Sequence, residues 1–225
     1  MSRNVGLMIA FAAVLAVAGV TEGAPIPVSS YAPVGSTVLN HTFAPDPDRV
    51  KLTDGVFPTG LTYSSAGWVG FGTSVKYVTL DFDLGSVNTV GSVEVYYLCA
   101  DADLARPSRM RVYGSTDGTF AGTGWGSNSD AGLPTTAADF GVANFPDTYK
   151  FGNPSTRSAQ DVLLTLTTPL NARYVRVVFD HFTNGTLDGN NLWVGEVGFF
   201  QPIPEPATLA LLSMGALALI RRRRA

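Results

Sequence analysis

Apolar side chains alternate with other residues over positions 77–84, and this two-residue period limits the fold more than any other feature. The apolar set is Val78, Leu80, Phe82 and Leu84, and the opposite set is Tyr77, Thr79, Asp81 and Asp83. Successive side chains of a strand point to opposite faces of a sheet, so the pattern predicts a strand with one buried face, ended by Gly85. The same period recurs in later segments, namely 92–97, 109–113, 162–166, 174–179 and 192–200.

No long segment shows the 3.6-residue period of a helix together with helix caps. Gly, Pro, Asn and Asp separate the predicted strands, which is typical of an all-β sandwich. Residues 115–158 interrupt the pattern because they are rich in small and polar residues and contain three prolines. They also hold several aromatic residues, so we expect part of this segment to pack over one end of the sandwich.

The N-terminus has the composition of an export signal. Arg3 supplies a positive charge, and residues 5–20 are small or apolar, a run that suits a signal sequence better than a membrane span. Cleavage is expected near residue 18 or 23, so residues 1–23 are assigned to the signal peptide. Pro25 and Pro27 follow at once and predict an extended mature start over residues 24–35. A retained N-terminal anchor is the alternative.

The C-terminus carries three features in order: a proline-rich segment from Pro202 to Pro206, an apolar run from Ala207 to Ile220, and four arginines at 221–224. Proline excludes a helix from the first part. A helix over the second would span roughly 21 Å, less than the roughly 30 Å of a hydrocarbon core, so it can anchor the chain only marginally. Arginines stay cytoplasmic by the positive-inside rule, which leaves the preceding chain outside.

These features resemble the PEP-CTERM sorting tail of exopolysaccharide-producing Gram-negative bacteria. The resemblance covers residues 202–225 and depends on Pro204, Glu205 and Pro206, the apolar helix, and the cluster Arg221, Arg222, Arg223 and Arg224. It implies recognition by an exosortase-type enzyme, transient anchoring in the inner membrane, and removal of the tail near the Pro-Glu-Pro. The mature protein is then expected at the cell surface or in the extracellular matrix. A plain tail anchor is the alternative.

The exported part, about residues 24–201, has the size of one domain. Setting aside Arg3 and the four tail arginines leaves 10 of the 15 basic residues, and setting aside Glu22 and Glu205 leaves 16 of the 18 acidic ones. The resulting net charge near −6 disfavours nucleic acid as a partner, because that requires clustered Lys and Arg. Cys99 is the only cysteine and forms no internal disulfide. A buried thiol is favoured over a reactive one.

Six segments of the middle region, in order, resemble a discoidin-type domain, also called a coagulation-factor type C domain. They are residues 51–55, 67–71, 78–85, 107–118, 172–177 and 195–200, and the likeness covers residues 36–201. The resemblance implies an eight-stranded jelly roll of the galactose-binding type. Such domains serve as carbohydrate-binding modules in many bacterial surface proteins.

The same resemblance implies a structural calcium site. The residues that match the family's calcium loop and its partner strand are Lys51, Asp54, Val56, Thr59, Gly195 and Glu196. Calcium takes six to eight oxygen ligands; Asp54 and Glu196 would supply charge, whereas Lys51, Val56 and Gly195 could supply only backbone oxygens. Val56 departs from the asparagine that is usual there. The alternative is that Asp54 and Gly55 form a simple turn and that Glu196 is a surface strand residue.

A sugar site would need aromatic faces in the end loops, with polar side chains nearby for the hydroxyl groups. By loop position, the candidates are Tyr63, Arg106, Trp125, Tyr149 and His181. Trp68 and Trp193 lie beside apolar strand residues and are predicted to belong to the core.

The sequence offers few residue combinations of the kind that enzymes use for catalysis. The two histidines, His41 and His181, have no metal-ligand spacing with each other or with the cysteine. Asp81 and Asp83 could mimic a carboxylate pair, but the solvent face of an amphipathic strand needs such residues. We therefore predict a non-catalytic surface or matrix protein that binds glycans, including the producer's exopolysaccharide. A structural protein that binds another surface protein, without a sugar site, is the alternative.

Overall fold

The structure, a computed structural model, describes residues 23–35, 37, 44–62, 64–71, 77–99, 104–105, 109–121, 142–144, 158–180, 182–183, 186–187 and 191–203. Residues 25–202 form one compact unit. The predicted signal peptide up to Glu22 and the sorting tail from Pro204 onward lie outside the described residues. In the part of the chain that is described, no helix is long and apolar enough to span a membrane.

All regular structure in the described residues is β-strand. The strands are β1 (Ser30–Pro33), β2 (Val69–Phe71), β3 (Tyr77–Cys99), β4 (Leu104–Ala105), β5 (Arg109–Ser115), β6 (Val142–Asn144), β7 (Ser158–Asp180), β8 (Phe182–Thr183), β9 (Thr186–Leu187) and β10 (Asn191–Phe200). The main sheet has the order β2-β10-β3-β7-β5-β6, with β1 beside β3 and β4 beside β10. Strand β6 and the short pair β8–β9 were not predicted, because two or three residues are too few to show a period.

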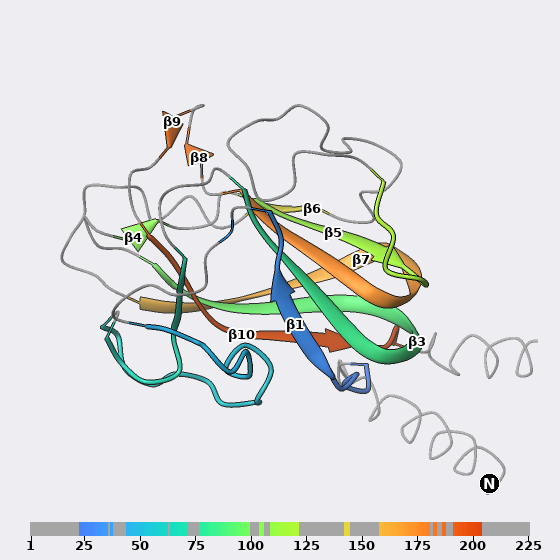
Figure 1. The fold of residues 1–225 in the computed structure, drawn as a ribbon, viewed down its shortest axis with the longest axis horizontal. Coiled ribbons are helices and arrows are strands. Elements are labelled where there is room, and N and C mark those ends of the chain that lie inside the picture. The colour runs from blue at the N-terminus through green and yellow to red at the C-terminus, as the bar shows by residue number, and fades with distance from the viewer. Residues whose placement is uncertain are drawn as a thin grey trace, which may run out of the picture. The chain divides into compact units, whose positions relative to one another are not determined.

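Strands β3 and β7 form one long antiparallel ribbon that bends and closes the sandwich (Figure 1). Residues 77–83 pair with 174–180, and residues 92–99 pair with 158–165. Between these halves the register shifts twice, after Asp83 and after Val90. We call the half with β1, β5 and β6 layer one, and the half with β2 and β10 layer two.

The two layers enclose a common core. The ring of Phe82 in layer one lies 5.1 Å from that of Phe199 in layer two. The predicted apolar sets meet there: Val78, Leu80 and Phe82 from layer one, with Val93, Val95, Tyr97, Val197 and Phe199 from layer two. Most of these residues are fully buried. The prediction of an all-β sandwich is thus confirmed.

Gly85 does not end its strand, as we predicted, but lies inside the bend of β3. Its φ is 75°, in the left-handed region that glycine adopts without strain. A Cβ atom there would also lie 2.6 Å from the Ser29 hydroxyl oxygen. A glycine therefore turns the ribbon from one layer to the other while the chain stays extended.

The folded unit begins earlier than residue 36, where we expected it to start. The Ile26 N–H donates to the Phe199 carbonyl at 2.7 Å, and Pro25 bridges to Phe200. Residues 30–33 then pair with 80–83 of β3. Residues 25–33 run extended up to and through β1, and their place in the sandwich depends on distant partners.

The solvent-side set of the first strand is less exposed than we predicted. Tyr77 is 3% exposed and Thr79 is fully buried. Tyr77 packs with Tyr113 and Val178 in a small cluster on the outer face of layer one. The alternation correctly separated two faces, but neighbouring strands and the turn around Phe120 cover part of the outer one.

Candidate functional site

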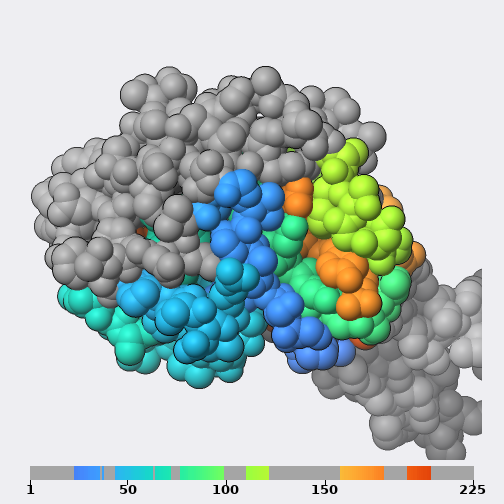
Figure 2. Space-filling model, in the orientation of Figure 1, coloured from blue at the N-terminus to red at the C-terminus, as the bar shows by residue number. Residues whose placement is uncertain are grey.

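The loop of residues 44–62, here called the docked loop, lies against the outer side of layer two. The Gly70 N–H donates to the Ala44 carbonyl at 3.1 Å, and the Val197 N–H donates to the Leu52 carbonyl at 2.7 Å. Leu52 is fully buried. Figure 2 shows this loop and the N-terminal segment side by side on one face. Backbone bonds therefore place residues 53–57 beside the open edge of β10.

A buried carboxylate organises the first turn of the docked loop. Asp46 is 2% exposed. Its two carboxylate oxygens accept hydrogen bonds from the N–H groups of Val50 and Lys51, both at 3.3 Å. The Lys51 ammonium donates to the Pro45 carbonyl. The Lys51 side chain thus caps its own loop.

A bulge at Gly195 brings β10 close to the docked loop. The pairing with β3 shifts between Val194 and Glu196, which leaves one extra residue on β10. A Cβ atom on Gly195 would lie 2.6 Å from Pro58 and 3.0 Å from Trp68. Only glycine permits this approach, which sets Glu196 beside the loop.

Glu196 is the most strongly perturbed acid among the residues described. It is 7% exposed, the Gly55 N–H donates to its Oε1 at 3.4 Å, and its Oε2 has no hydrogen-bond partner. The pKa of Glu196 is raised from 4.5 to about 7, mainly by burial; the Gly55 hydrogen bond lowers it, and the charges of Asp54 and Glu94 also raise it. A cation near this carboxylate would favour its charged form.

The predicted calcium residues are partly brought together. Asp54 Oδ1 accepts a hydrogen bond from the Val56 N–H at 2.8 Å, and Gly55 has a φ of 74°, so the predicted turn is confirmed. The alternative that Glu196 is an ordinary surface residue is wrong, because the docked loop buries it. Val56 and Thr59 are exposed.

Within the described part of the chain, no three side chains of His, Cys, Asp or Glu are arranged to hold a metal ion. Calcium would therefore need backbone oxygens beside Asp54 and Glu196. That donor set is the one which the sequence resemblance implied, and its hard oxygen chemistry suits calcium.

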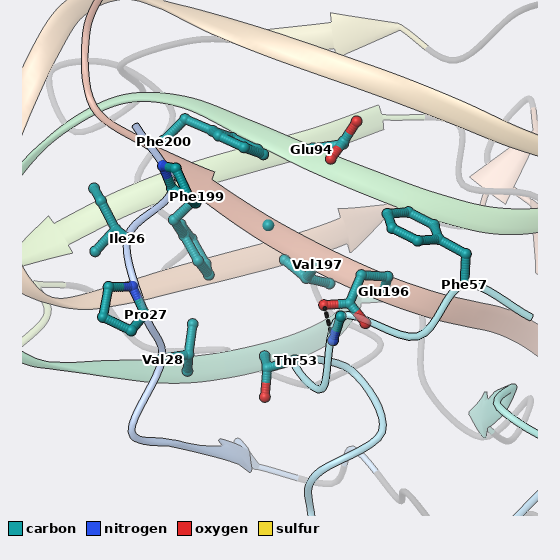
Figure 3. A pocket seen from close by; sticks show the side chains of 13 residues that line it. Ile26, Pro27, Val28, Thr53, Phe57, Glu94, Glu196, Val197, Phe199 and Phe200 are labelled. Atoms are coloured by element: carbon teal, nitrogen blue, oxygen red, sulfur yellow. Dashed lines mark hydrogen bonds between the residues drawn. The ribbon is translucent and has the colours of Figure 1, made fainter. Parts of the chain in front are cut away.

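A pocket of about 220 Å³ opens between the docked loop, the N-terminal segment and the end of β10. Figure 3 shows Glu196, Glu94 and Phe57 on one side of it and Ile26, Pro27 and Val28 on the other. We call it the acidic pocket, and its lining is Pro25, Ile26, Pro27, Val28, Thr53, Gly55, Phe57, Glu94, Glu196, Val197, Gly198, Phe199 and Phe200. Sequence analysis singled out only Glu196 of this set as a site residue. Thr53, Gly55 and residues 197–200 lie in segments of the discoidin-like resemblance, and the other lining residues match no motif.

Aromatic stacking supports the rim of the pocket. The Phe57 ring meets Tyr96 edge to face with centroids 5.2 Å apart, and Tyr96 stacks on Trp68 at 5.6 Å. Trp68 donates to the Gly60 carbonyl at 2.8 Å. Trp68 and Trp193 are buried, which confirms their assignment to the core.

The carboxylates of layer one are held in a different way. Arg176 donates to both oxygens of Asp81 at 2.6 and 2.7 Å, and Arg173 donates to both oxygens of Asp83 at 2.9 and 3.0 Å. Phe120 lies 4.1 Å from the Arg176 guanidinium. Asp81 and Asp83 are thus neutralised one by one and do not form a carboxylate pair for acid–base chemistry.

The candidate sugar contacts lie outside the described residues, and this applies to Tyr63, Arg106, Trp125, Tyr149 and His181. The side chain of Cys99 also lies outside them, although its backbone pairs with Ser158.

Comparison with known sequences decides the assignment of the C-terminus. Residues 202–224 match the PEP-CTERM protein-sorting motif. The chain therefore carries the sorting signal of an exported protein that is directed to the cell surface. The match contains Pro204, Glu205, Pro206 and the four arginines, so the predicted PEP-CTERM tail is confirmed.

Solved structures similar to this chain include carbohydrate-binding proteins. The family 32 carbohydrate-binding module of C. perfringens NanJ in complex with galactose is 13% identical, with a TM-score of 0.44, over 80% of this chain and all of its own. The lectin domain of Lectinolysin complexed with Lewis b antigen is 16% identical, with a TM-score of 0.43, over 81% of this chain and all of its own. No curated protein matches the chain.

Proposed function

We propose that this protein is a non-catalytic surface or matrix protein whose sandwich binds carbohydrate, with the producer's exopolysaccharide as the expected ligand. The sorting motif supports export and surface display. The discoidin-like segments of the sequence favour a binding module. After export, an exosortase-type enzyme removes the tail, which holds the chain transiently in the inner membrane.

The placement of the chain ends carries this proposal. Pro25 bridges to Phe200 at the end of the sandwich where β3 and β7 bend. At the opposite end, Tyr77 pairs with Asp180, and Cys99 pairs with Ser158 (Figure 1). Within the unit of residues 25–202, the strand ends at 99, 158 and 180 therefore lie at the other end from Phe200, after which the chain leads to the sorting tail.

We further propose that a structural calcium ion joins the docked loop to β10. Asp54 and Glu196 would supply charge, with backbone oxygens of Lys51, Val56 and Gly195 and the Thr59 side chain completing the set. The unpartnered Oε2 of the buried Glu196 supports this role. Calcium would fix the loop in place and keep Glu196 ionised.

A glycan array with the full chain, with calcium and then with chelator, tests the sugar-binding function. Binding to polysaccharide, including polymer from the producing bacterium, is the expected result. Absence of binding to every polysaccharide in the presence of calcium would overturn the proposal. Mass spectrometry of protein from the native host tests sorting, because an intact run from Arg221 to Arg224 on the mature form contradicts tail removal.

One observation favours the alternative of a structural protein that contacts another surface protein. The docked loop exposes four apolar side chains, with Val50 53%, Val56 59%, Phe57 46% and Leu61 43% exposed. Exposed apolar groups on one loop are a feature of protein contact surfaces. Replacing Val56 and Leu61 by Ser should leave glycan binding unchanged if sugar is the ligand.

A further inference from the structure

Residues 57–61 of the docked loop form a short extended segment at the surface of the molecule. Exposure alternates along the segment: Phe57, Thr59 and Leu61 are exposed, whereas Pro58 is buried and Gly60 is half-buried. An exposure period of two residues is that of a strand with one face against the protein. The segment therefore resembles a strand, although no strand of the described residues pairs with it.

The inner edge of this segment is bound to the sandwich through two carbonyl groups. Trp68 Nε1 donates to the Gly60 carbonyl at 2.8 Å, and the Tyr96 hydroxyl donates to the Pro58 carbonyl at 3.4 Å. Pro58 also packs closely on β10, since a Cβ atom on Gly195 would lie 2.6 Å from it. Alternate residues of an extended chain direct their N–H and C=O groups to the same edge. The backbone groups of residues 57, 59 and 61 therefore point away from the sandwich.

The outer edge of the segment keeps its hydrogen-bond donors. The N–H groups of Phe57, Thr59 and Leu61 make no hydrogen bond with any residue that the structure describes. Pro58 lacks an N–H group, but that gap lies on the inner edge and does not interrupt the outer one. Proteins usually protect exposed strand edges with charged side chains or proline, whereas residues 55–75 contain no charged residue. The outer edge is therefore able to pair with an added strand.

We propose that this outer edge pairs with the same segment of a second copy of the protein, antiparallel about a two-fold axis at Thr59. A two-fold interface requires a self-complementary surface. This register provides it, because Phe57 lies opposite the partner's Leu61 and Leu61 lies opposite the partner's Phe57. In the single chain these side chains are 46% and 43% exposed, so pairing covers apolar surface and also satisfies the backbone groups.

Charge and side-chain spacing favour a second copy over an unrelated strand. The exported part is acidic, so two copies repel each other over much of their surface, but the uncharged residues 55–75 allow a close approach. An unrelated strand would need apolar residues at matching positions, whereas an identical segment supplies them. The pairing uses only the backbone of Thr59 and none of the oxygens proposed for calcium.

Sedimentation velocity of the protein recovered from its native host after export tests the proposal. Dimers should form as the protein concentration rises. Leu61→Asp places a carboxylate beside the partner's Phe57 and should weaken dimerisation at least about tenfold. Val50→Asp is the matched control, because Val50 is 53% exposed on the same loop but lies outside the segment, and it should leave dimerisation unchanged. A monomer at every concentration would overturn the proposal, and so would equal effects of the two variants.

Two further variants of Leu61 distinguish strand pairing from a simple apolar contact. Leu61→Pro removes an N–H group from the outer edge and should weaken dimerisation at least about tenfold more than Leu61→Ala, which keeps that group. Urea unfolding of each variant confirms that it is folded. Equal dimerisation of the folded proline and alanine variants would show that the backbone edge takes no part, and the proposal would be wrong.

Cysteine cross-linking tests the register. A Phe57→Cys chain mixed with a Leu61→Cys chain, both in a Cys99→Ser background, should form disulfide-linked dimers, because the two new thiols lie opposite each other in the pair. Neither chain alone should do so, since identical positions lie four residues apart along the paired strands. A mixture that dimerises without cross-links would overturn the register about Thr59.

Discussion

The outer faces of the two layers hold their carboxylates in opposite electrostatic states. In layer one, hydrogen bonds from Arg173 hold the pKa of Asp83 below its ordinary value of 3.8. In layer two, burial raises the pKa of Glu196, close to Glu94 of β3, to about 7. The comparison teaches that a paired arginine stabilises the charge of a carboxylate on the sheet, whereas burial under a loop without such a donor disfavours that charge.

Strand register explains the difference. Asp81 lies opposite Arg176 on β7, so an arginine fork reaches its carboxylate directly. Glu94 lies between Leu163 of β7 and Gly198 of β10, neither of which carries a charge. Layer one therefore pairs Asp81 with an arginine inside the sheet, whereas in layer two the docked loop covers Glu196.

The largest expected effect concerns Glu196 and pH. Because its folded pKa is raised, the folded state holds a proton that the unfolded state releases between about pH 4.5 and pH 7. The contribution of Glu196 to stability should be complete below pH 4.5 and fall by roughly 3 kcal/mol as the pH rises to 7 and above. Urea unfolding in chelator across this range measures the fall.

Glu196→Gln is the matched variant, since it keeps the shape and removes the titration. It should be more stable than the unaltered protein at pH 8 and should lack this part of the slope. If both proteins showed the same dependence of stability on pH, Glu196 would not titrate with a raised pKa, and the contrast between the two layers would be wrong.

The second effect concerns the two bidentate ion pairs, Arg176–Asp81 and Arg173–Asp83. Arg176→Met should cost about 2 kcal/mol, because it removes two charge-assisted hydrogen bonds and leaves Asp81 partly buried without its partner. Asp81 keeps 29% of its side chain exposed, so the loss stays below that of a fully buried pair. Urea unfolding at pH 7 measures it.

Arg173→Met provides the control, because the Arg173 side chain is 40% exposed and its pair is screened by solvent. Its loss should be clearly smaller than that of Arg176→Met. Equal losses of stability in the two variants would mean that burial does not determine how much each Arg–Asp ion pair contributes.

Calcium should give the third effect. At a free concentration ten times the dissociation constant, binding to the folded state alone would add about 1.4 kcal/mol to stability. Thermal melting with calcium and with chelator measures this rise. Asp54→Asn should reduce it, whereas Asp48→Asn should not. If the melting temperature were the same with calcium and with chelator, the proposal that calcium binds the docked loop would be wrong.

The smallest effect should appear in acid and with the opposite sign to that of Glu196. The lowered pKa of Asp83 stabilises the folded state above its ordinary value of 3.8, and this contribution is lost as the pH falls through the lowered value. Asp83→Asn should therefore lose less stability than the unaltered protein between pH 4 and pH 2. Parallel acid unfolding curves for the two proteins would contradict this.

Much of the fold could be predicted because it depends on local periodicity. The alternations at 77–84 and 174–179 identified buried sets that meet in the core. The bend at Gly85 could not be predicted as a continuous ribbon, because a glycine signals a strand end and a positive-φ bend equally well. Strand β1 shows no period over its four residues, and it depends on pairing with β3.

The candidate site was predictable only in part. Motif resemblance pointed to Asp54 and Glu196, and the structure brings that turn and that glutamate together. Glu94, Phe57 and the segment 25–28 were missed, because they come from three distant parts of the chain and match no motif. Burial of Glu196 was missed as well, because the docked loop that covers it lies far away in the sequence.

The sequence by itself determined what adjacent residues can encode: an all-β chain, through the two-residue period, and a sorting address, through the Pro-Glu-Pro, the apolar run and the arginines. Only the tertiary structure decided which carboxylates face arginine and which face a pocket. The reason is that charge and burial act across strands. Asp83 and Arg173 are far apart in the chain and bonded in space, whereas the buried Oε2 of Glu196 meets no such donor.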